Sequence, residues 1–216
     1  MAAAALADGA GSRARSELGA EAVVRASLRL LTGQFDELYE MCCRDIVEAR
    51  RHIHDHLMRV LQKQATRHAC DVDELASTVL FVAHKGNRFI AGHLGDGVIV
   101  QVDGNGTVST LSHPENGEYA NTTVFVTDSS AAEKIRLYHG HSPQRLAGFA
   151  LMSDGCAESL YDKRSGAPAA AISKLVEWNG DLSRKKMVGV LNSNMQQAFS
   201  RKTADDCSLA VISIPA

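Results

Sequence analysis

Short β-rich runs separated by tight turns constrain the fold of this chain more than any other feature. The runs are rich in β-branched and aromatic residues and cover residues 77–84, 88–94, 98–103 and 107–111. Glycine and asparagine mark turns at residues 85–87 and 104–106. Parallel neighbours in a sheet need a crossover of about a dozen residues, whereas antiparallel neighbours need only a tight turn. The sequence therefore predicts an antiparallel meander in the middle of the chain.

Two amphipathic helical patterns precede these strands. The first covers residues 12–31, and the second covers residues 35–68 as one long helix after a break at Gly33. Apolar residues recur at intervals of three and four, which places them on one face of each helix. Such a face packs on a flat apolar surface, so we expect both helices to cover a sheet.

The second half of the chain adds further elements and completes a single domain over residues 1–216. Strands are predicted over residues 123–127, 136–138, 149–153 and 208–214, and helices over residues 169–178 and 183–200. No internal repeat or low-complexity linker divides the chain, and 216 residues suffice for one sizeable core. The predicted fold class is α+β, with antiparallel sheets and helices packed outside them.

Composition excludes several classes of protein. The chain has 23 basic and 25 acidic residues and a net charge of −2, which argues against a nucleic-acid or anionic-membrane binder. No apolar run reaches the roughly 18 residues of a membrane span. Five cysteines without a C-x-x-C pair predict neither a disulfide framework nor a zinc ribbon. We expect a cytoplasmic protein with reduced thiols.

Four aspartates fall at the ends of predicted strands. They are Asp8, Asp96, Asp154 and Asp205, and the first three are followed directly by glycine. Carboxylates held close together repel one another, so such a cluster favours a bound cation. Oxygen ligands without histidine or cysteine suit Mg²⁺ or Mn²⁺ better than zinc. Glycine beside a ligand allows the backbone to approach the ion closely.

Asp-Gly is also the strongest short signal for a hairpin turn. We interpret Asp103-Gly104, between two short strands, as a plain turn, and the same interpretation stays open for Asp96-Gly97. Asp8 and Asp154 differ because a helical pattern follows each of them, rather than a returning strand.

Several short motifs occur in a fixed order from Asp8 to the end of the chain. They are Asp8-Gly9-Ala10-Gly11-Ser12, Ser77-Thr78, Gly95-Asp96-Gly97, Gly117-Glu118-Tyr119-Ala120-Asn121, Met152-Ser153-Asp154-Gly155 and Asp205-Asp206-Cys207-Ser208-Leu209. In order and spacing they resemble the metal-dependent protein serine/threonine phosphatases, the protein phosphatase 2C family, in its bacterial branch. The resemblance implies a four-layer α-β-β-α sandwich and hydrolysis of phosphoserine or phosphothreonine.

The resemblance also implies a role for each aspartate. Asp8 is similar to the carboxylate that bridges two Mn²⁺ or Mg²⁺ ions, with the Gly9 carbonyl as a further ligand. Asp154 and Asp205 are similar to the other protein ligands of the first metal. Asp96, together with Asp154, is similar to the residues that hold a third, more weakly bound ion. In this family a metal-activated water is the nucleophile, so no catalytic side chain is implied.

Three departures from the family pattern bear on activity. Only seven residues precede Asp8, so we expect the family's N-terminal strand, which carries a ligand of the second metal, to be missing. Ala10 stands where many relatives have histidine, and Gly97-Val98 stands where the family usually has Ser-Arg. The first metal site therefore looks complete and the second incomplete, which puts the activity in doubt. The alternative function is a weakened phosphatase-like module that binds a partner or phosphoprotein without turnover.

The resemblance implies a phosphoprotein substrate and a cognate serine/threonine kinase as partners. The sequence does not indicate which phosphoprotein is the substrate, what the oligomeric state is, or what Glu118 and Asn121 do. Two other motifs have simpler interpretations. Cys156 lacks the arginine that a cysteine phosphatase loop requires, and it is expected to be an inert thiol. His52 and His56 share a helix face without a third ligand, so zinc is not expected there.

Overall fold

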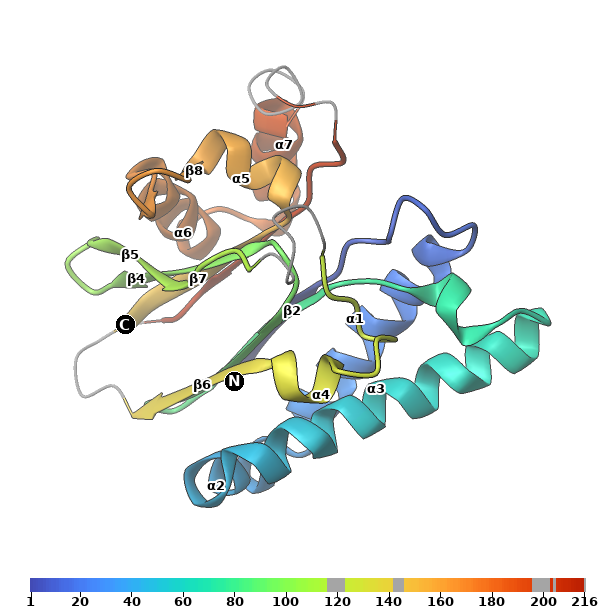
Figure 1. Cartoon of the computed structure of the whole chain (residues 1–216). Coiled ribbons are helices and arrows are strands. Elements are labelled where there is room, and N and C mark those ends of the chain that lie inside the picture. The colour runs from blue at the N-terminus through green and yellow to red at the C-terminus, as the bar shows by residue number, and fades with distance from the viewer. Residues whose placement is uncertain (116–122, 142–145, 196–202, 204, 216) are drawn as a thin grey trace.

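The computed structural model describes residues 1–115, 123–141, 146–195, 203 and 205–215 of the chain. Two four-stranded antiparallel sheets lie face to face, and helices cover both outer faces (Figure 1). The predicted α+β class is confirmed, and the order of the layers agrees with an α-β-β-α sandwich. Within the described ranges, no helix combines the length and the apolar character needed to cross a membrane.

The first sheet is covered by the N-terminal helices. Its strands, in spatial order, are β1 (Ala2–Leu6), β2 (Val79–Lys85), β3 (Arg88–Leu94) and β6 (Arg136–His141). The helices on this side of the molecule are α1 (Ser16–Gly33), α2 (Phe35–Arg44), α3 (Ile46–His68), the short 3₁₀ helix η1 (Val72–Leu75) and α4 (Ala131–Lys134) (Figure 1).

The second sheet is covered by the C-terminal helices. Its strands, in spatial order, are β10 (Leu209–Ser213), β7 (Leu146–Met152), β4 (Val98–Asp103) and β5 (Val108–Ser112). The helices on this side are α5 (Asp154–Leu160), α6 (Ala171–Asp181) and α7 (Arg184–Asn194), and a two-stranded hairpin of β8 (Tyr161–Asp162) and β9 (Ala167–Pro168) follows α5.

Alternating side chains of the central strands supply three separate apolar layers. In β2, Phe81 packs with the N-terminal helices, whereas Val82 lies between the two sheets. In β7, Met152 packs with the C-terminal helices, whereas Phe149 lies between the sheets. Successive side chains of a strand point to opposite faces, so a continuous apolar run serves two cores at once. Each sheet is thus buried on both faces.

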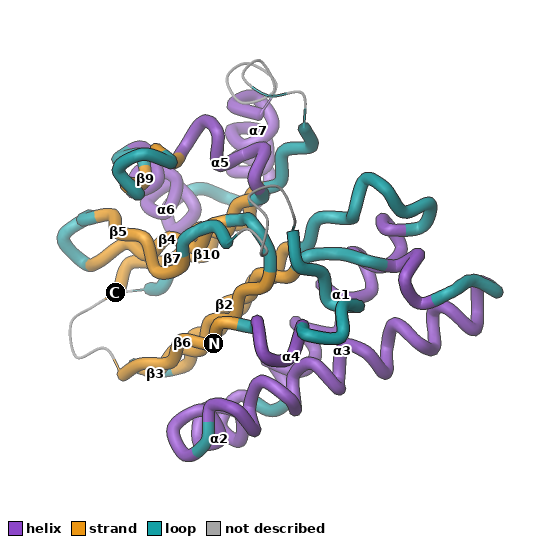
Figure 2. The backbone as a smooth tube through the Cα atoms, in the orientation of Figure 1, coloured by secondary structure: helices purple, strands orange, loops and turns teal. Residues whose placement is uncertain are grey.

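The chain passes from the first sheet to the second between β3 and β4. Strand β3 pairs with β2 and β6, whereas β4 pairs with β5 and β7. Residues 95–97 therefore join two sheets and do not close a hairpin (Figure 2). The predicted meander is divided at this point, although the turns at residues 85–87 and 104–106 do close hairpins as predicted.

The prediction of one helix over residues 35–68 is wrong, because the chain divides at Asp45. The Asp45 backbone is extended, with φ −150° and ψ 100°, and its carboxylate accepts the N–H groups of Val47 (2.9 Å) and Glu48 (3.1 Å). A capping carboxylate satisfies the free N–H groups of a new helix start. Apolar periodicity did not reveal the division, since α2 and α3 both bury the stripe that the sequence indicates.

The strand predicted over residues 123–127 is also wrong, because these residues form coil and a turn. The Val126 N–H donates to the Ser77 carbonyl (2.8 Å), and the Phe125 N–H donates to the Asp128 carboxylate (2.8 Å). An aspartate that binds a nearby N–H competes with a strand ladder, which outweighed the local β propensity.

The other predicted elements are present with shifted ends. The helix predicted over residues 12–31 begins at Ser16, and those predicted over 169–178 and 183–200 correspond to α6 and α7. Residues 196–202, at the end of the last prediction, lie outside the described residues. The strands predicted over 136–138, 149–153 and 208–214 correspond to β6, β7 and β10.

Candidate metal centre

Strand register gathers the predicted aspartates of the second sheet at one of its ends. Met152, the last residue of β7, pairs with Val98 on one side and with Leu209 on the other. Because both pairings are antiparallel, the residues after Met152 lie beside the residues before Val98 and before Leu209. These three segments carry Asp154, Asp96 and Asp205, respectively.

Asp8 reaches the same end of the sandwich from the first sheet. The Asp8 N–H donates to Thr78 Oγ1 (2.9 Å), and the Thr78 N–H donates to the Asp8 carbonyl (2.9 Å). An antiparallel bridge then joins Gly9 to Ser77. A Cβ on Gly9 would lie 2.8 Å from Ser16 Oγ, so only glycine fits there without a shift. The backbone of the Asp8-Gly9 pair is therefore held by residues 77–78 on one side and by Ser16 on the other.

Ser153 joins the segment after β7 to the segment before β10. Its hydroxyl donates to the Asp206 carbonyl (3.1 Å) and accepts the Ser208 N–H (3.0 Å). A Cβ on Gly155 would lie 2.6 Å from the Asp206 carbonyl oxygen, so the two segments touch through their backbones. This contact holds Asp154 beside the start of β10.

The loop that carries Asp96, residues 95–97 (the Asp96 loop), is held by contacts with Thr123 and Thr78. Thr123 Oγ1 donates to Asp96 Oδ2 at 2.5 Å. Gly95 has φ +114°, and a Cβ on it would lie 2.5 Å from Cγ2 of Thr78. This position requires glycine both for its backbone conformation and for the close approach of Thr78, the residue before β2.

The electrostatics of these residues show that they share one patch. Burial and, in decreasing order, the carboxylates of Asp154, Asp96, Asp205 and Asp206 together raise the pKa of Asp8 to about 6. Burial also raises the pKa of Asp154, and Asp96 and Asp205 add to that rise. Like charges close together disfavour ionisation of one another. The structure thus brings the four predicted aspartates within electrostatic range.

The donor set is made of oxygens and suits a hard cation such as Mg²⁺ or Mn²⁺. Within the ranges that the structure describes, however, no three histidine, cysteine, aspartate or glutamate side chains lie close enough together to hold one ion. Asp154 Oδ1 accepts the Gly155 N–H (2.8 Å), and Asp96 Oδ2 accepts the Thr123 hydroxyl. The aspartates therefore suit a hard cation by the chemistry of their oxygens and lie at one end of the sandwich, although no three of the described metal-ligating side chains surround a single point. Local donors orient Asp154 and Asp96.

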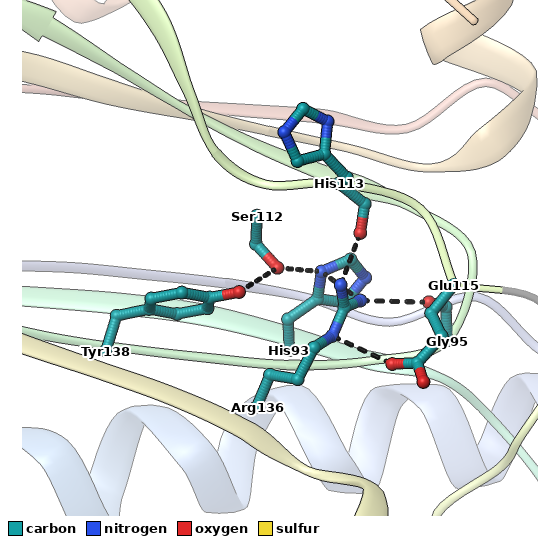
Figure 3. Close-up of polar contacts among 7 residues, drawn as sticks. All are labelled: His93, Gly95, Ser112, His113, Glu115, Arg136 and Tyr138. Carbon is teal, nitrogen blue, oxygen red and sulfur yellow. Dashed lines mark hydrogen bonds and ion pairs between the residues drawn. The ribbon is translucent and has the colours of Figure 1, made fainter. Parts of the chain in front are cut away.

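A buried polar network beside the predicted site was not indicated by the sequence (Figure 3). At its centre is Arg136, the first residue of β6. Arg136 Nη1 donates to the His113 carbonyl (2.6 Å), and Nη2 lies 2.9 Å from His93 Nδ1 and 3.5 Å from the Gly95 carbonyl. Arg136 Nε lies 3.1 Å from Glu115 Oε2 in an ion pair. One guanidinium thus joins β6 to two other segments of the chain, residues 93–95 and 113–115.

His93 forms the buried side of this network. Its Nδ1 lies 2.8 Å from Ser112 Oγ, which also accepts the Tyr138 hydroxyl at 3.2 Å. Burial, and then the charge of Arg136, hold the pKa of His93 well below its usual value of 6.5. Arg136 and Tyr138 share one face of the strand predicted over residues 136–138, but this spacing alone does not indicate a polar network.

Two secondary interpretations agree with the structure. Asp103 Oδ1 accepts the N–H groups of Asn105 (2.9 Å) and Thr107 (2.8 Å), as expected of a plain turn. Burial raises the pKa of the Cys156 thiol to about 12, as expected of an inert core cysteine. Glu118 and Asn121 lie outside the described residues.

Comparison with solved structures identifies the same fold in bacterial phosphatases. PppA, described as a key regulatory component of T6SS in Pseudomonas aeruginosa, is 19% identical with a TM-score of 0.63, covering 98% of this chain and 86% of that one. The serine/threonine phosphatase PstP of Mycobacterium tuberculosis is 14% identical with a TM-score of 0.62, covering 97% and 86%.

A PstP catalytic domain in complex with two manganese ions is 16% identical with a TM-score of 0.58, covering 97% of this chain and 86% of that one. No curated protein matches the chain in sequence. At these identities the solved structures establish the fold, and the family rests on a sequence model. The model of the protein phosphatase 2C family matches residues 1–192, so the chain belongs to that family.

Proposed function

We propose that this protein is a metal-dependent phosphatase that hydrolyses phosphoserine and phosphothreonine in proteins. One observation carries the proposal: carboxylates from four distant segments meet at one end of the sandwich, where burial and mutual repulsion raise the pKa of Asp8 to about 6. An aspartate that serves only its own turn, such as Asp103, binds the N–H groups of that turn instead. Membership of the protein phosphatase 2C family supports the same function.

In the proposed site, Asp8 and the Gly9 carbonyl, with Asp154 and Asp205, hold two Mn²⁺ or Mg²⁺ ions, and Asp96 with Asp154 holds a third, weaker one. Bound there, such ions supply an activated water and offset charge on the phosphoryl oxygens. The chain itself contributes placement: strand ends and tight glycine contacts fix the backbones that carry the carboxylates. Rigid elements position such ligands better than loops do.

A second candidate function is binding of a phosphoprotein or partner without turnover. One observation favours it: among the described residues, no three metal-ligating side chains are gathered around a single point. Ala10, buried at the position after Gly9, also provides no proton donor for a leaving group. In this case the carboxylates would bind fewer than two ions tightly.

Release of phosphate from a phosphothreonine peptide tests the proposal. We expect turnover by the purified chain with Mn²⁺, and its loss with EDTA. Asp154→Asn keeps the size of the side chain but removes its charge, and it should lower kcat/KM by at least about 100-fold, since even residues that only orient metal ligands contribute 10- to 100-fold. Asp103→Asn, at a turn aspartate outside the site, is the matched control and should leave activity unchanged.

Calorimetric titration with Mn²⁺ separates the two candidate functions. Two or more tight ions together with turnover support the phosphatase. Fewer than two tight ions, with no turnover at any Mn²⁺ concentration, would instead support the binding module. Turnover that survives both EDTA and Asp154→Asn would contradict the metal-dependent site altogether.

A further inference from the structure

We propose that Arg136 is a positioning residue for Asp96: its guanidinium holds the backbone from which that carboxylate projects. The inference deepens the proposed function, since it rests on Asp96 as a ligand of the weakest ion. Arg136 lies in β6, at the edge of the first sheet. A guanidinium can only donate hydrogen bonds, so Arg136 is not itself a metal ligand and acts through other groups.

The contacts of Arg136 converge on the loop that carries Asp96. The Gly95 carbonyl, one residue before Asp96, lies 3.5 Å from Arg136 Nη2 and accepts the Glu115 N–H at 3.3 Å. Glu115 is in turn paired with Arg136 Nε at 3.1 Å. The three groups close a ring in which each member fixes the other two (Figure 3).

His93 makes this arrangement a rigid one. Its imidazole is fully buried, and Nδ1 faces both Arg136 Nη2 (2.9 Å) and Ser112 Oγ (2.8 Å). A guanidinium can only donate, so Nδ1 is the acceptor and the proton lies on Nε2. Two donors, from Arg136 and Ser112, therefore hold the ring at Nδ1, and His93 in turn fixes the position of the Arg136 guanidinium. The planar guanidinium serves several acceptors at once, which a lysine ammonium on a flexible stem does not do with the same geometry.

The other side of the Asp96 loop has an independent support. Thr123 Oγ1 donates to Asp96 Oδ2, and Thr78 packs where a side chain on Gly95 would otherwise lie. With Arg136 removed, these contacts still hold the carboxylate and the floor of the loop, but the Gly95 carbonyl loses its donor from β6. We therefore expect a displaced ligand and a weaker ion, rather than loss of the fold.

The test compares Arg136→Met with Arg88→Met. Arg88 lies in β3 of the same sheet, pairs with Asp36 and covers the rings of Phe35 and Tyr39. Its side chain is 31% exposed, against 23% for Arg136, so both substitutions remove a half-buried, ion-paired guanidinium. Only Arg136, however, contacts the Asp96 loop. Arg136→Lys keeps the positive charge but lacks the fork.

Hydrogen exchange of the metal-free protein is the first measurement. Arg136→Met should raise exchange at the Glu115 amide, which donates to the Gly95 carbonyl, by about tenfold or more, whereas Arg88→Met should leave it unchanged. Equal exchange in wild type and Arg136→Met would overturn the proposal. This measurement requires no metal, so its failure is distinct from failure of the proposed function.

Electron paramagnetic resonance of free Mn²⁺ is the second measurement. Arg136→Met should weaken the weakest Mn²⁺ by about 10- to 100-fold, the range found for residues that orient metal ligands, and leave the tighter ions in place. Full recovery by Arg136→Lys, or an equal loss with Arg88→Met, would overturn the positioning role. If wild type binds no Mn²⁺ but the exchange difference is present, Arg136 holds the loop and it is the proposed function that fails.

Discussion

Two Asp-Gly pairs flank the same strand, β4, and have opposite roles. Asp96-Gly97 precedes the strand, and Asp103-Gly104 ends it. At the far end, backbone N–H groups lower the pKa of Asp103. At the near end, Asp96 is half-buried and raises the pKa of both Asp8 and Asp154. The same dipeptide is thus a self-contained turn in one place and part of a shared charge cluster in the other.

Whether the chain stays in one sheet or passes between the two sheets decides between these roles. After Asp103 the chain returns in the same sheet as β5, so the carboxylate binds the N–H groups of its own turn. Before β4 the chain has just left the other sheet, so Asp96 lies where the ends of both sheets meet. A crossing between sheets brings distant segments together, whereas a hairpin brings together only its own residues.

The largest expected difference between the two ends of β4 is that substitutions there have opposite effects on activity and on stability. Asp8→Asn removes a proposed bridging ligand and should lower kcat/KM by at least about 100-fold, beyond the effect of residues that orient a ligand. In EDTA the same substitution should raise the melting temperature by a few degrees, because it removes a half-buried charge among four other carboxylates. Asp103→Ala should do the reverse, keeping activity and lowering the melting temperature through loss of its turn hydrogen bonds.

Phosphate release and thermal unfolding, measured on the same preparations, check these opposite effects. A lower melting temperature for Asp8→Asn than for the wild type, both measured in EDTA, would contradict the repulsion inferred among the carboxylates. Loss of activity in Asp103→Ala would contradict the division between the two ends of β4.

The next largest difference concerns glycine: replacing it should cost more stability before β4 than in the turn after it. Gly95→Ala combines φ +114° with a Cβ placed 2.5 Å from Cγ2 of Thr78. Thr78 is buried and its hydroxyl accepts the Asp8 N–H, so it yields only by breaking that contact. Gly106→Ala, in the β4–β5 turn at φ +82°, meets only Ser173 Oγ at 3.1 Å. We expect a loss in the free energy of unfolding of about 3 kcal/mol for Gly95→Ala and about 1 kcal/mol for Gly106→Ala.

Urea denaturation at constant pH measures both values. Equal losses would mean that the backbone conformation alone, and not the packing of Thr78, makes Gly95 necessary. A loss at Gly106 larger than at Gly95 would contradict the close approach of Thr78 to the Asp96 loop.

Sequence patterns predicted the hairpins and turns but missed a helix cap and the contacts that depend on strand register. The hairpins, the β10 strand and the plain Asp103 turn follow from composition and spacing, and the structure confirms them. The division of the long helix depended on one carboxylate, that of Asp45, binding two N–H groups. A period of apolar residues does not report such a cap.

The candidate site shows the same limit. Its aspartates lie at the ends of predicted strands and match a family pattern, but spacing alone does not prove that they meet. The pairing of Met152 with both Val98 and Leu209 is what brings three of them to one end, and pairing is a property of the whole sheet. Arg136 carried no motif at all, since two of its four partners are backbone carbonyls, which are the same in every sequence, and the other two, His93 and Glu115, are distant from it in the chain.

The smallest expected difference between the two ends of β4 lies in the pH dependence of stability. The pKa of Asp8 is about 6 in the folded protein and about 3.8 unfolded, so between these values the folded state binds more protons. In EDTA, the Asp8 contribution to the free energy of unfolding should therefore rise as the pH falls from 7 to 4. Asp103 has the opposite sign: its lowered pKa gives a contribution that is present above 3.8 and is lost below it.

His93 opposes Asp8 in the same window, because its lowered pKa destabilises the fold as the pH falls below 6.5. The difference between wild type and Asp8→Asn cancels this effect, since both proteins contain His93. We expect that difference to change by about 1 kcal/mol between pH 7 and pH 4, less than a fully buried carboxyl would give, because solvent screens a half-exposed group. Urea unfolding at several pH values measures it. A difference that does not vary with pH would mean that Asp8 titrates as an isolated aspartate, and the cluster would then resemble the Asp103 turn.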